Sequence, residues 1–295
     1  MTQLDPFLID IGTLGVLVFV ITSMLGMGFS LTISQIVAPL RNTRLVLMSL
    51  AANFIIVPVL VLLIAWTIPL SEGLQIGLIL TGMAAGAPFL PKLVQVAKGD
   101  MAFAAGLMVL MMVVTIAYLP IVLPFVLTGV QVNPWEIARS LIFLMLIPLA
   151  LALLIRAKCE EVATGLIPTM KMASSLSLVV LFVAYFGAYY DDVSGVIGTG
   201  GALSAILLIV VAAGVGYLLG GPDIDRRKVL TLGTGQRNLA AAFAVASSNF
   251  QSNPDVLVEV MDVSILGLAI LMVIAAYLGR RSVARVGDNE GQRRA

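Results

Sequence analysis

The residues best suited to chemistry lie in a polar stretch within a long apolar run. Residues 230–243 read LTLGTGQRNLAAAF and include Gln236, Arg237 and Asn238. A charged side chain near the centre of a bilayer costs about 2.5–3.5 kcal/mol on insertion scales, so its presence implies a partner or a function. A second cation, Lys92, lies in another apolar run. Two such cations would attract an anionic ligand, and no catalytic arrangement accompanies them.

The composition excludes several kinds of chemistry. Of the 295 residues, 60% are hydrophobic and 11% are charged, whereas a soluble domain carries about 25% charged residues. We therefore expect a membrane protein that crosses the bilayer several times. The chain has no histidine and one cysteine, Cys159, which excludes histidine-based metal sites, imidazole bases and internal disulfides. We expect no enzymatic activity, no cofactor and no nucleic-acid partner, and the sequence indicates no particular protein partner.

Nine apolar runs have about the 20 residues that a helix needs to cross a bilayer. These runs are 7–30, 44–67, 73–98, 101–128, 136–156, 167–190, 193–219, 227–250 and 256–279. We therefore predict a transmembrane domain of nine spans over 1–280, surrounded by the lipid bilayer of the inner (plasma) membrane. A short cytoplasmic tail, 281–295, follows it and is expected to be disordered.

The basic residues of the loops indicate the orientation of the chain. One face collects Arg41, Arg156, Arg226 and Arg280, whereas the other face receives mainly acidic residues such as Asp191. Lysine and arginine gather in cytoplasmic loops. A count of nine spans places the basic loops on one side, so we predict that the N-terminus is outside and the C-terminus is cytoplasmic.

Two of the nine runs are interrupted near their middle, the first of them by prolines. In 73–98, the apolar stretch contains Gly86, Pro88 and Pro91. Proline lacks a backbone donor and clashes with the preceding turn, so a helix should end near Gly86. A second helix should start near Pro91, because proline suits the first turn of a helix.

The second interruption lies in 227–250, where Gly233 and Gly235 weaken the helix and Asn238 can cap the half that follows. The two interrupted runs are five spans apart, so they cross the membrane in opposite directions. Paired, antiparallel, interrupted helices indicate an inverted-repeat transporter. We therefore predict an all-α polytopic membrane protein with an inverted-repeat transporter fold and two crossed broken helices. The alternative is that both interruptions are kinks that only assist packing.

The crossing is expected to be electropositive and to bind the substrate. Each restarted half-helix directs its positive N-terminal dipole and its unpaired N–H groups towards the membrane centre, where a carboxylate would fit. A structural alternative is that Arg237 pairs with Glu259 or Asp262 of the last span. Asp262 is the best candidate for a buried acid, either as an ion-pair partner or as a proton carrier. The candidate substrate-binding residues are Asn53, Phe89, Lys92, Thr234, Gln236, Arg237 and Asn238.

Four segments together resemble the bile acid:sodium symporter family, in the same order and with similar spacing. They are LGMGFSLT (25–32), NFIIVP (53–58), VAKGDMAFA (96–104) and KVLTLGTGQRN (228–238). The resemblance covers nearly the whole chain. It implies a fold of two inverted five-helix repeats in which two broken helices cross, with the first helix of the family missing here.

The resemblance also implies two sodium ions beside the crossing, and this chain departs from the residues that bind them. By spacing, the glutamate of the family corresponds to Gly233 and its neighbouring glutamine to Arg237, while the next asparagine is kept as Asn238. The other polar ligands of the family correspond to Leu90, Pro91, Ala104, Met108 and Asn53. Most oxygen ligands of both ions are therefore missing.

This departure argues against sodium coupling. A fixed cation 4 Å from a bound sodium ion would repel it by roughly 4 kcal/mol at an effective dielectric of 20. We therefore expect Arg237 and Lys92 to take the places of the two ions and to hold the crossing together. At most, a weak sodium site at Gly233, Thr234 and Asn53 would remain.

The residues as a whole favour a secondary transporter that moves a small or amphipathic organic anion by alternating access. Ordinary sodium:organic-anion symport is one alternative, and proton-driven exchange or facilitated diffusion is another. Lys92 can lose a proton in a low-dielectric site, whereas arginine stays charged. A membrane-embedded ligand sensor or scaffold is a further alternative.

Overall fold

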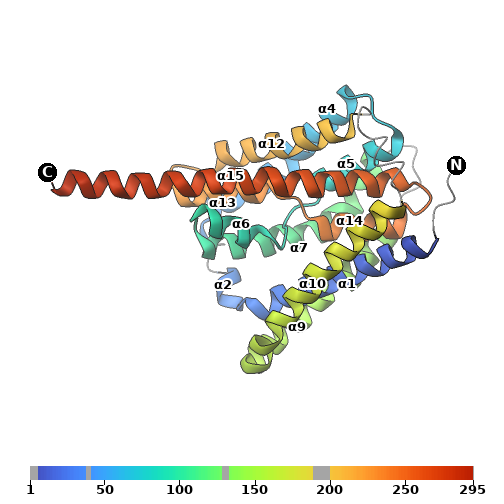
Figure 1. Cartoon of the computed structure of the whole chain (residues 1–295), viewed down its shortest axis with the longest axis horizontal. Coiled ribbons are helices and arrows are strands. Elements are labelled where there is room, and N and C mark those ends of the chain that lie inside the picture. The colour runs from blue at the N-terminus through green and yellow to red at the C-terminus, as the bar shows by residue number, and fades with distance from the viewer. Residues whose placement is uncertain (1–5, 38–40, 128–132, 189–199, 295) are drawn as a thin grey trace.

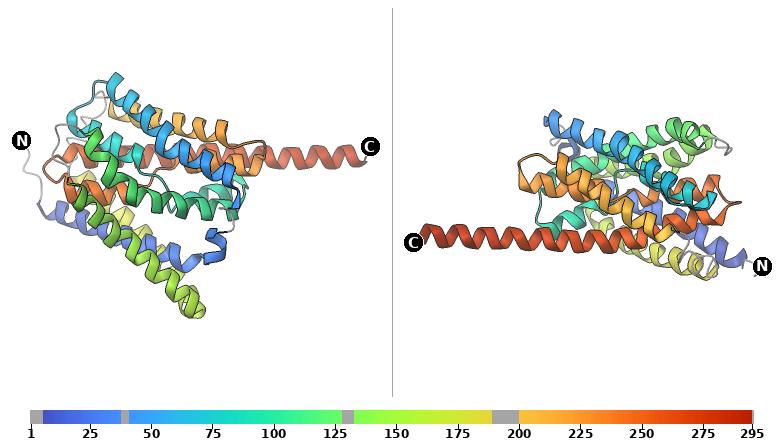
Figure 2. Two further views of the ribbon diagram at one scale, coloured as in Figure 1. Left: turned by 180° about the vertical axis from the view of Figure 1, so that it is seen from behind. Right: turned by 90° about the horizontal axis from the view of Figure 1, so that it is seen from above.

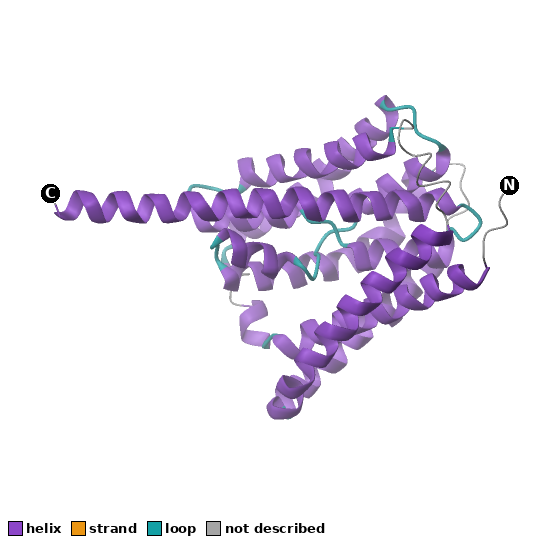
Figure 3. Ribbon diagram, viewed as in Figure 1, coloured by secondary structure: helices purple, strands orange, loops and turns teal. Residues whose placement is uncertain are grey.

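Helices form every regular element that the structure describes (Figures 1 and 3). The structure is a computed structural model and describes residues 6–37, 41–127, 133–188 and 200–294. In chain order the elements, with π-helical turns marked η, are α1 (Pro6–Ser30), α2 (Ile33–Val37), α3 (Thr43–Ala51), η2 (Ala52–Ile56), α4 (Val57–Thr67), α5 (Glu72–Met83), α6 (Leu90–Ala97), α7 (Met101–Val126), α8 (Pro134–Leu141), η3 (Ile142–Leu146), α9 (Ile147–Lys158), α10 (Glu160–Ala188), α12 (Gly201–Leu219), α13 (Ile224–Gly235), α14 (Leu239–Asn249) and α15 (Pro254–Arg294).

Seven helical stretches within the described residues are long and apolar enough to cross a membrane. They are Phe7–Ser30, Thr43–Thr67, Met101–Val126, Pro134–Lys158, Glu160–Tyr185, Gly201–Leu219 and Pro254–Arg280. Each falls on one of the nine predicted spans. The other two predicted spans, 73–98 and 227–250, are each divided into two shorter helices. The chain is therefore an all-α, multi-pass membrane protein, as predicted.

Two of the spanning helices contain a π-helical turn. The turns η2 and η3 each come just before a proline, Pro58 or Pro148, that is the second residue of the following helix. Proline has no N–H to donate and its ring crowds the carbonyl four residues earlier. One wider turn accommodates this crowding, and such turns often occur at functional sites. The turn η2 holds Asn53, one of the predicted site residues.

The first break separates α5 from α6 at residues 84–89, within a few residues of the prediction. Gly86 has φ +83°, a conformation that residues with a side chain rarely adopt. A Cβ atom on Gly86 would also lie 2.2 Å from the backbone nitrogen of Met112 in α7. Glycine is thus required here both by conformation and by close packing. Pro91 lies in the first turn of α6, as expected.

The second break separates α13 from α14 and consists of Gln236, Arg237 and Asn238. The prediction that Gly233 and Gly235 form this break is wrong, because both residues lie within α13. They allow close packing instead, since a Cβ atom on Gly235 would lie 2.7 Å from the side chain of Leu271. Asn238 caps α14 as predicted, because its side chain accepts the N–H of Ala241.

The two broken helices run in opposite directions and cross. Figure 1 shows α6 and α13 at the end of the bundle from which the tail of α15 projects, and α5 and α14 towards the other end. The helix α6 packs against α13, and α5 packs against α14. In Figure 3 the loops that interrupt the broken helices lie inside the bundle.

The helices α1, α9 and α10 pack against one another and, with α8 and η3, which continue directly into α9, form what we call the side group. Small residues allow this close packing: a Cβ atom on Gly15 would lie 3.0 Å from Leu181, and one on Gly28 would lie 2.5 Å from Ala152. What we call the crossing group consists of the broken helices with α7, α12, α15 and the continuous span of α3, η2 and α4. The two groups touch through α1 against α14 and through α8 against α7 and α14.

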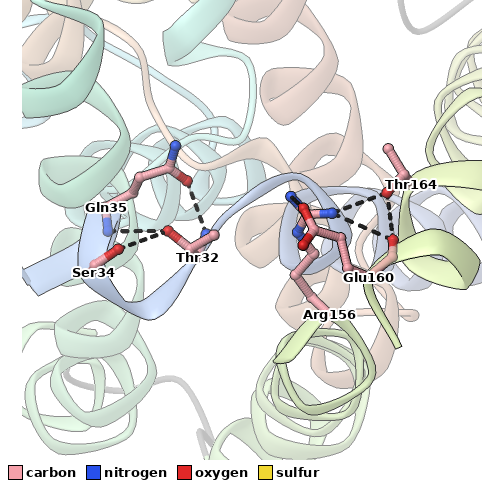
Figure 4. Close-up of polar contacts among 6 residues, drawn as sticks. All are labelled: Thr32, Ser34, Gln35, Arg156, Glu160 and Thr164. Atoms are coloured by element: carbon pink, nitrogen blue, oxygen red, sulfur yellow. Dashed lines mark hydrogen bonds and ion pairs between the residues drawn. The ribbon is translucent and has the colours of Figure 1, made fainter. Parts of the chain in front are cut away.

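Polar contacts stabilise the chain where α1 and α9 end (Figure 4). The Thr32 N–H donates to Gln35 Oε1 at 2.9 Å and the Gln35 N–H to Thr32 Oγ1 at 3.3 Å, a reciprocal cap at the start of α2. Arg156 pairs with Glu160 at 2.9 Å and donates to Thr164 at 3.0 Å. These contacts fix the turn between α9 and α10.

The last helix does not end where the predicted tail begins. Instead α15 continues to Arg294 and extends beyond the bundle in each view (Figure 2). The segment 281–294 contains no proline, but Gly287 and Gly291 are weak helix formers, so the expected disorder of the tail stays a prediction. Asp191, expected on the outer face, lies outside the described residues.

Candidate functional site

Arg237 lies at the point where the two broken helices cross, and its side chain is 1% exposed. Its guanidinium donates to backbone carbonyls of α5, with Nε 3.3 Å from Thr81 O and Nη2 2.6 Å from Gly82 O. The Nη1 atom donates to Thr234 O of α13 at 2.9 Å and to Asn53 Oδ1 at 3.0 Å. The acceptors are three backbone carbonyls and one amide oxygen, all of them uncharged.

These carbonyls belong to the last turns of α5 and α13. The last four carbonyls of a helix lack partners within the helix and carry the negative end of its dipole. Arg237 therefore neutralises the C-terminal ends of both helices at once. Hydrogen bonds that involve a charged group contribute about 1.5–3 kcal/mol each, which offsets the cost of burying the guanidinium.

The alternative that Arg237 pairs with an acid of the last span is not what the structure has. Among the described residues, the ion pairs are Arg156–Glu160, Arg226–Asp100 and Lys228–Asp225. Arg237 binds backbone carbonyls because α5 and α13 both end beside it. Glu259 of α15 instead accepts a hydrogen bond from Ser204 of α12.

Asn53 connects the π-helical turn η2 to α13. Its Nδ2 donates to Ser49 O at 3.0 Å and to Thr234 Oγ1 at 3.3 Å, while its Oδ1 accepts from Arg237. The side chain is 1% exposed. Asn53, predicted as a substrate-binding residue, thus holds both Arg237 and Thr234 in place.

Asn238 joins the second break to the first. Its N–H donates to Ala84 O at 2.9 Å, and its Nδ2 donates to Ala85 O at 3.1 Å. Thr115 of α7 holds the same loop from the other side, because its hydroxyl lies 3.0 Å from both N and O of Ala85. Thr115 was not among the predicted site residues, although a threonine within the apolar stretch MMVVTIAY is a usable signal.

Lys92 does not join Arg237 at the crossing, so the expectation of two buried cations there is wrong. The buried face of α6 consists of Leu90, Leu93, Val94 and Ala97. Lys92 lies on the opposite face and is exposed, as is Phe89, the residue before α6. The helical register explains the difference, because positions i, i+3, i+4 and i+7 share one face.

The oxygens predicted for a weak sodium site are engaged by protein donors. Thr234 O and Asn53 Oδ1 both accept from Arg237, and Thr234 Oγ1 faces Asn53 Nδ2. The side chains nearest to Gly233 are apolar, since a Cβ atom there would lie 3.1 Å from Leu90 and 3.5 Å from Leu107. This part of the crossing presents few oxygens to an ion.

Gln236 and Asp262 are the remaining predicted site residues. Gln236 is 4% exposed and its Oε1 has no hydrogen-bond partner among the described residues. Asp262 is partly buried in α15, and its Oδ2 is likewise unpartnered within the described part of the chain. Neither side chain belongs to the hydrogen-bond network around Arg237.

A cavity of about 570 Å³ opens where α3, α7 and α13 begin. Its lining includes Arg41 and Arg226, and Arg226 Nε lies 3.8 Å from Asp100 Oδ2. Near it, buried Lys228 Nζ donates to Lys98 O at 2.9 Å and to Asp225 at 2.7 Å, which ties the end of α6 to the start of α13. The cavity is therefore basic and adjoins the broken helices.

Comparison with known proteins gives two findings. A model of the Sodium Bile acid symporter family matches residues 17–194, more than half of the chain. The chain is also 22% identical to the "Uncharacterized sodium-dependent transporter YocS" of Bacillus subtilis (strain 168) over 243 residues, which cover 77% of this chain and 72% of that protein.

Proposed function

Because the chain belongs to the Sodium Bile acid symporter family, we propose that it is a secondary transporter of a small or amphipathic organic anion that does not need sodium. Membership of this family supports transport as the activity. The anionic substrate, the independence from sodium and the plasma-membrane location are our own inferences. We also infer that the two broken helices belong to inverted repeats.

The position of Arg237 is the observation that carries this proposal. Its guanidinium binds the carbonyls at which α5 and α13 end. An ion placed among the same carbonyls would meet a fixed positive charge, and roughly 4 kcal/mol of repulsion results at 4 Å and an effective dielectric of 20. Arg237 thus does permanently what a bound cation would do, and the crossing does not require one.

The anionic substrate is inferred from the cations that remain accessible. Arg237 is buried and uses its donors within the protein, so it is not available to a ligand in this conformation. Lys92 is exposed in the first turn of α6, and Phe89 beside it is 40% exposed. A helix N-terminus and a lysine attract a carboxylate, and Phe89 offers an apolar surface to an amphipathic one.

Alternating access is inferred from the division into two groups of helices. The side group packs tightly within itself through glycine contacts, and the crossing group is held by Arg237, Asn53 and Asn238. Each group can therefore move as a unit. Rocking of one group against the other around a central site is the usual mode of such transporters.

Uptake by proteoliposomes that contain the purified protein tests the proposal. A panel of labelled organic acids is offered under separately imposed sodium, potassium and proton gradients. We expect uptake of at least one acid, at a rate that is the same with sodium and with potassium. Uptake that requires sodium would favour ordinary sodium symport, which is the second candidate because the Bacillus relative is named a sodium-dependent transporter.

Uptake of no acid, together with saturable binding of one of them, would favour a membrane sensor or scaffold. Lys92→Gln is the matched variant for the substrate inference, since it removes an exposed charge without disturbing the buried face of α6. We expect it to raise the KM for the transported acid. An unchanged KM would contradict the placement of the substrate at α6.

A further inference from the structure

Glu259 of α15 is buried within the bundle, away from Arg237 and its acceptors. Its side chain is 0% exposed, its Oε1 accepts from Ser204 Oγ of α12 at 3.0 Å, and its Oε2 has no partner among the described residues. Gly77 of α5 makes room for it, because a Cβ atom there would lie 2.7 Å from Glu259 Cβ. Three helices therefore enclose this carboxyl group.

Asp262 lies three residues further along α15, and residues at this spacing share one face of a helix. It is less deeply buried than Glu259, and its Oδ2 also lacks a partner within the described residues. The two acids thus form a pair with one member enclosed and the other partly accessible. We call this pair, with Ser204, the acid cluster.

The helices packed against α15 supply no cation to the acid cluster. On α5 the charged residue is Glu72, which is exposed at the start of the helix, and α12 and α14 carry no charged residue, although α12 has Tyr217. Lys92 of α6 is exposed. The charged residues of α13, which are Asp225, Arg226, Arg227 and Lys228, lie in its first turns and make contacts there.

A carboxylate that is enclosed by apolar helices and has no cation beside it is strongly disfavoured relative to its neutral, protonated form. The donor set also suits a proton better than a metal ion, since it offers two carboxyl groups and one hydroxyl, and the described residues contain no group of three metal-ligating acids, histidines or cysteines. We propose that the acid cluster is a proton-binding site, with Glu259 holding the proton and Asp262 exchanging it with water.

The chemistry of this site is a simple acid–base exchange. The Glu259 carboxyl group releases a proton to water by way of Asp262 and takes one up again, and no other bond is made or broken. If the proposed transport function holds, this proton is the coupling ion that replaces sodium. That last step rests on the proposed function, whereas proton binding itself does not.

Infrared spectroscopy of the full-length protein in lipid discs tests proton binding without any substrate. At pH 7 a glutamate in water, with a pKa of about 4.3, is ionised. We expect the wild-type protein to show the carbonyl-stretch band of a protonated carboxyl group. Glu259→Gln should remove this band, while Glu72→Gln, which alters the exposed acid of α5, should leave it unchanged.

Ser204→Ala keeps the carboxyl group and removes its hydrogen-bond donor, so it should shift the band to a higher frequency. This variant also decides the question if Glu259→Gln does not fold. Asp262→Asn should keep the band but slow its loss when the sample is moved to high pH. These shifts assign the proton to Glu259 and its exchange to Asp262.

The proposal is overturned if the wild-type and Glu259→Gln spectra agree, or if Ser204→Ala leaves the band in place. It is also overturned if the band appears only after sodium is removed, because Glu259 would then be the ligand of a cation. Failure of the transport assay leaves these spectra unaffected, so the two proposals can fail separately.

Discussion

A single arginine replaces, in this chain, the contacts that would otherwise have to come from ions or water at the ends of two helices. The guanidinium of Arg237 reaches four oxygens from α5, α13 and η2. Its planar shape and its several donors suit this task, whereas lysine would supply one point charge. The residue is therefore structural in the described conformation, and we expect its effect on transport to be indirect.

Arg237→Ala should weaken the crossing, because the variant leaves Gly82 O and Asn53 Oδ1 without their donor. Each buried acceptor left unsatisfied costs about 1–3 kcal/mol. We expect the variant to insert in the membrane, to melt at a lower temperature and to lose transport. Arg139→Ala, at an exposed position of α8, is the control and should change neither property.

Restoring the family residues should restore a response to sodium. The double variant Arg237→Gln and Gly233→Glu removes the fixed charge and adds a carboxylate, with Leu90 the side chain that must give way. Thermal stability in sodium and in potassium at equal ionic strength measures the effect. Sodium at a hundred times its Kd would add about 2.7 kcal/mol. Sodium-specific stabilisation of the unaltered protein would contradict the idea of a tethered cation.

At the scale of the elements, the two breaks differ in how they are made. The first is an extended loop that α7 holds through Thr115 and that presses Gly86 against the backbone at Met112. The second is a short turn of three residues that Asn238 closes as a helix cap. The first break depends on a close approach of two backbones, and the second depends mainly on side chains.

Gly86→Ala should therefore be far more harmful than an ordinary glycine substitution. The new Cβ atom would lie 2.2 Å from Met112 N, at a φ of +83°, so the loop or α7 must move. We expect loss of folded protein, measured by size-exclusion chromatography in detergent. Gly214→Ala in α12 is the matched control, since nothing lies within 4 Å of its new Cβ atom. That variant should gain about 0.5–1 kcal/mol.

The sequence predicted these elements well where a residue type by itself restricts the backbone, as proline and a capping asparagine do. Pro88 and Pro91 indicated the first break, and Asn238 indicated the cap of α14. The partners of Arg237 could not be predicted, because they are mainly carbonyl groups, which every residue has. The exposure of Lys92 depends on which face of α6 is buried. The sequence does not determine this face, because the prolines leave open the residue at which α6 begins.

At the scale of the whole molecule, few helices connect the crossing group and the side group. The main contacts are those of α1 with α14 and of α8 with α7 and α14. The long helix α15 runs along the crossing group and continues beyond the bundle (Figure 2). The acid cluster lies on this helix, and α15 also packs against α5, α6, α13 and α14. Because α15 contacts both broken helices, we expect a change of charge on α15 to affect the packing of both.

The orientation in the membrane can be measured by labelling single cysteines in a Cys159→Ser background. We expect an impermeant thiol reagent added to intact cells to label Glu72→Cys and not Arg226→Cys. The reason is that basic loops stay on the cytoplasmic side, and the two positions lie in the first turns of α5 and α13, which run in opposite directions. Labelling at position 226 from outside would refute the nine-span topology.

The bond from Arg237 to Gly82 joins residues 155 positions apart in the chain, and this separation has a consequence for biosynthesis. A ribosome that adds about 5–20 residues per second needs on the order of 10–30 s to deliver the arginine after the glycine. During that interval α5 is already made but Arg237 is not, so we expect the Gly82 carbonyl of the nascent chain to lack the donor that it has in the folded protein. Chains truncated before Arg237 should therefore be preferred targets of membrane proteases, whereas chains truncated just after α14 should survive longer.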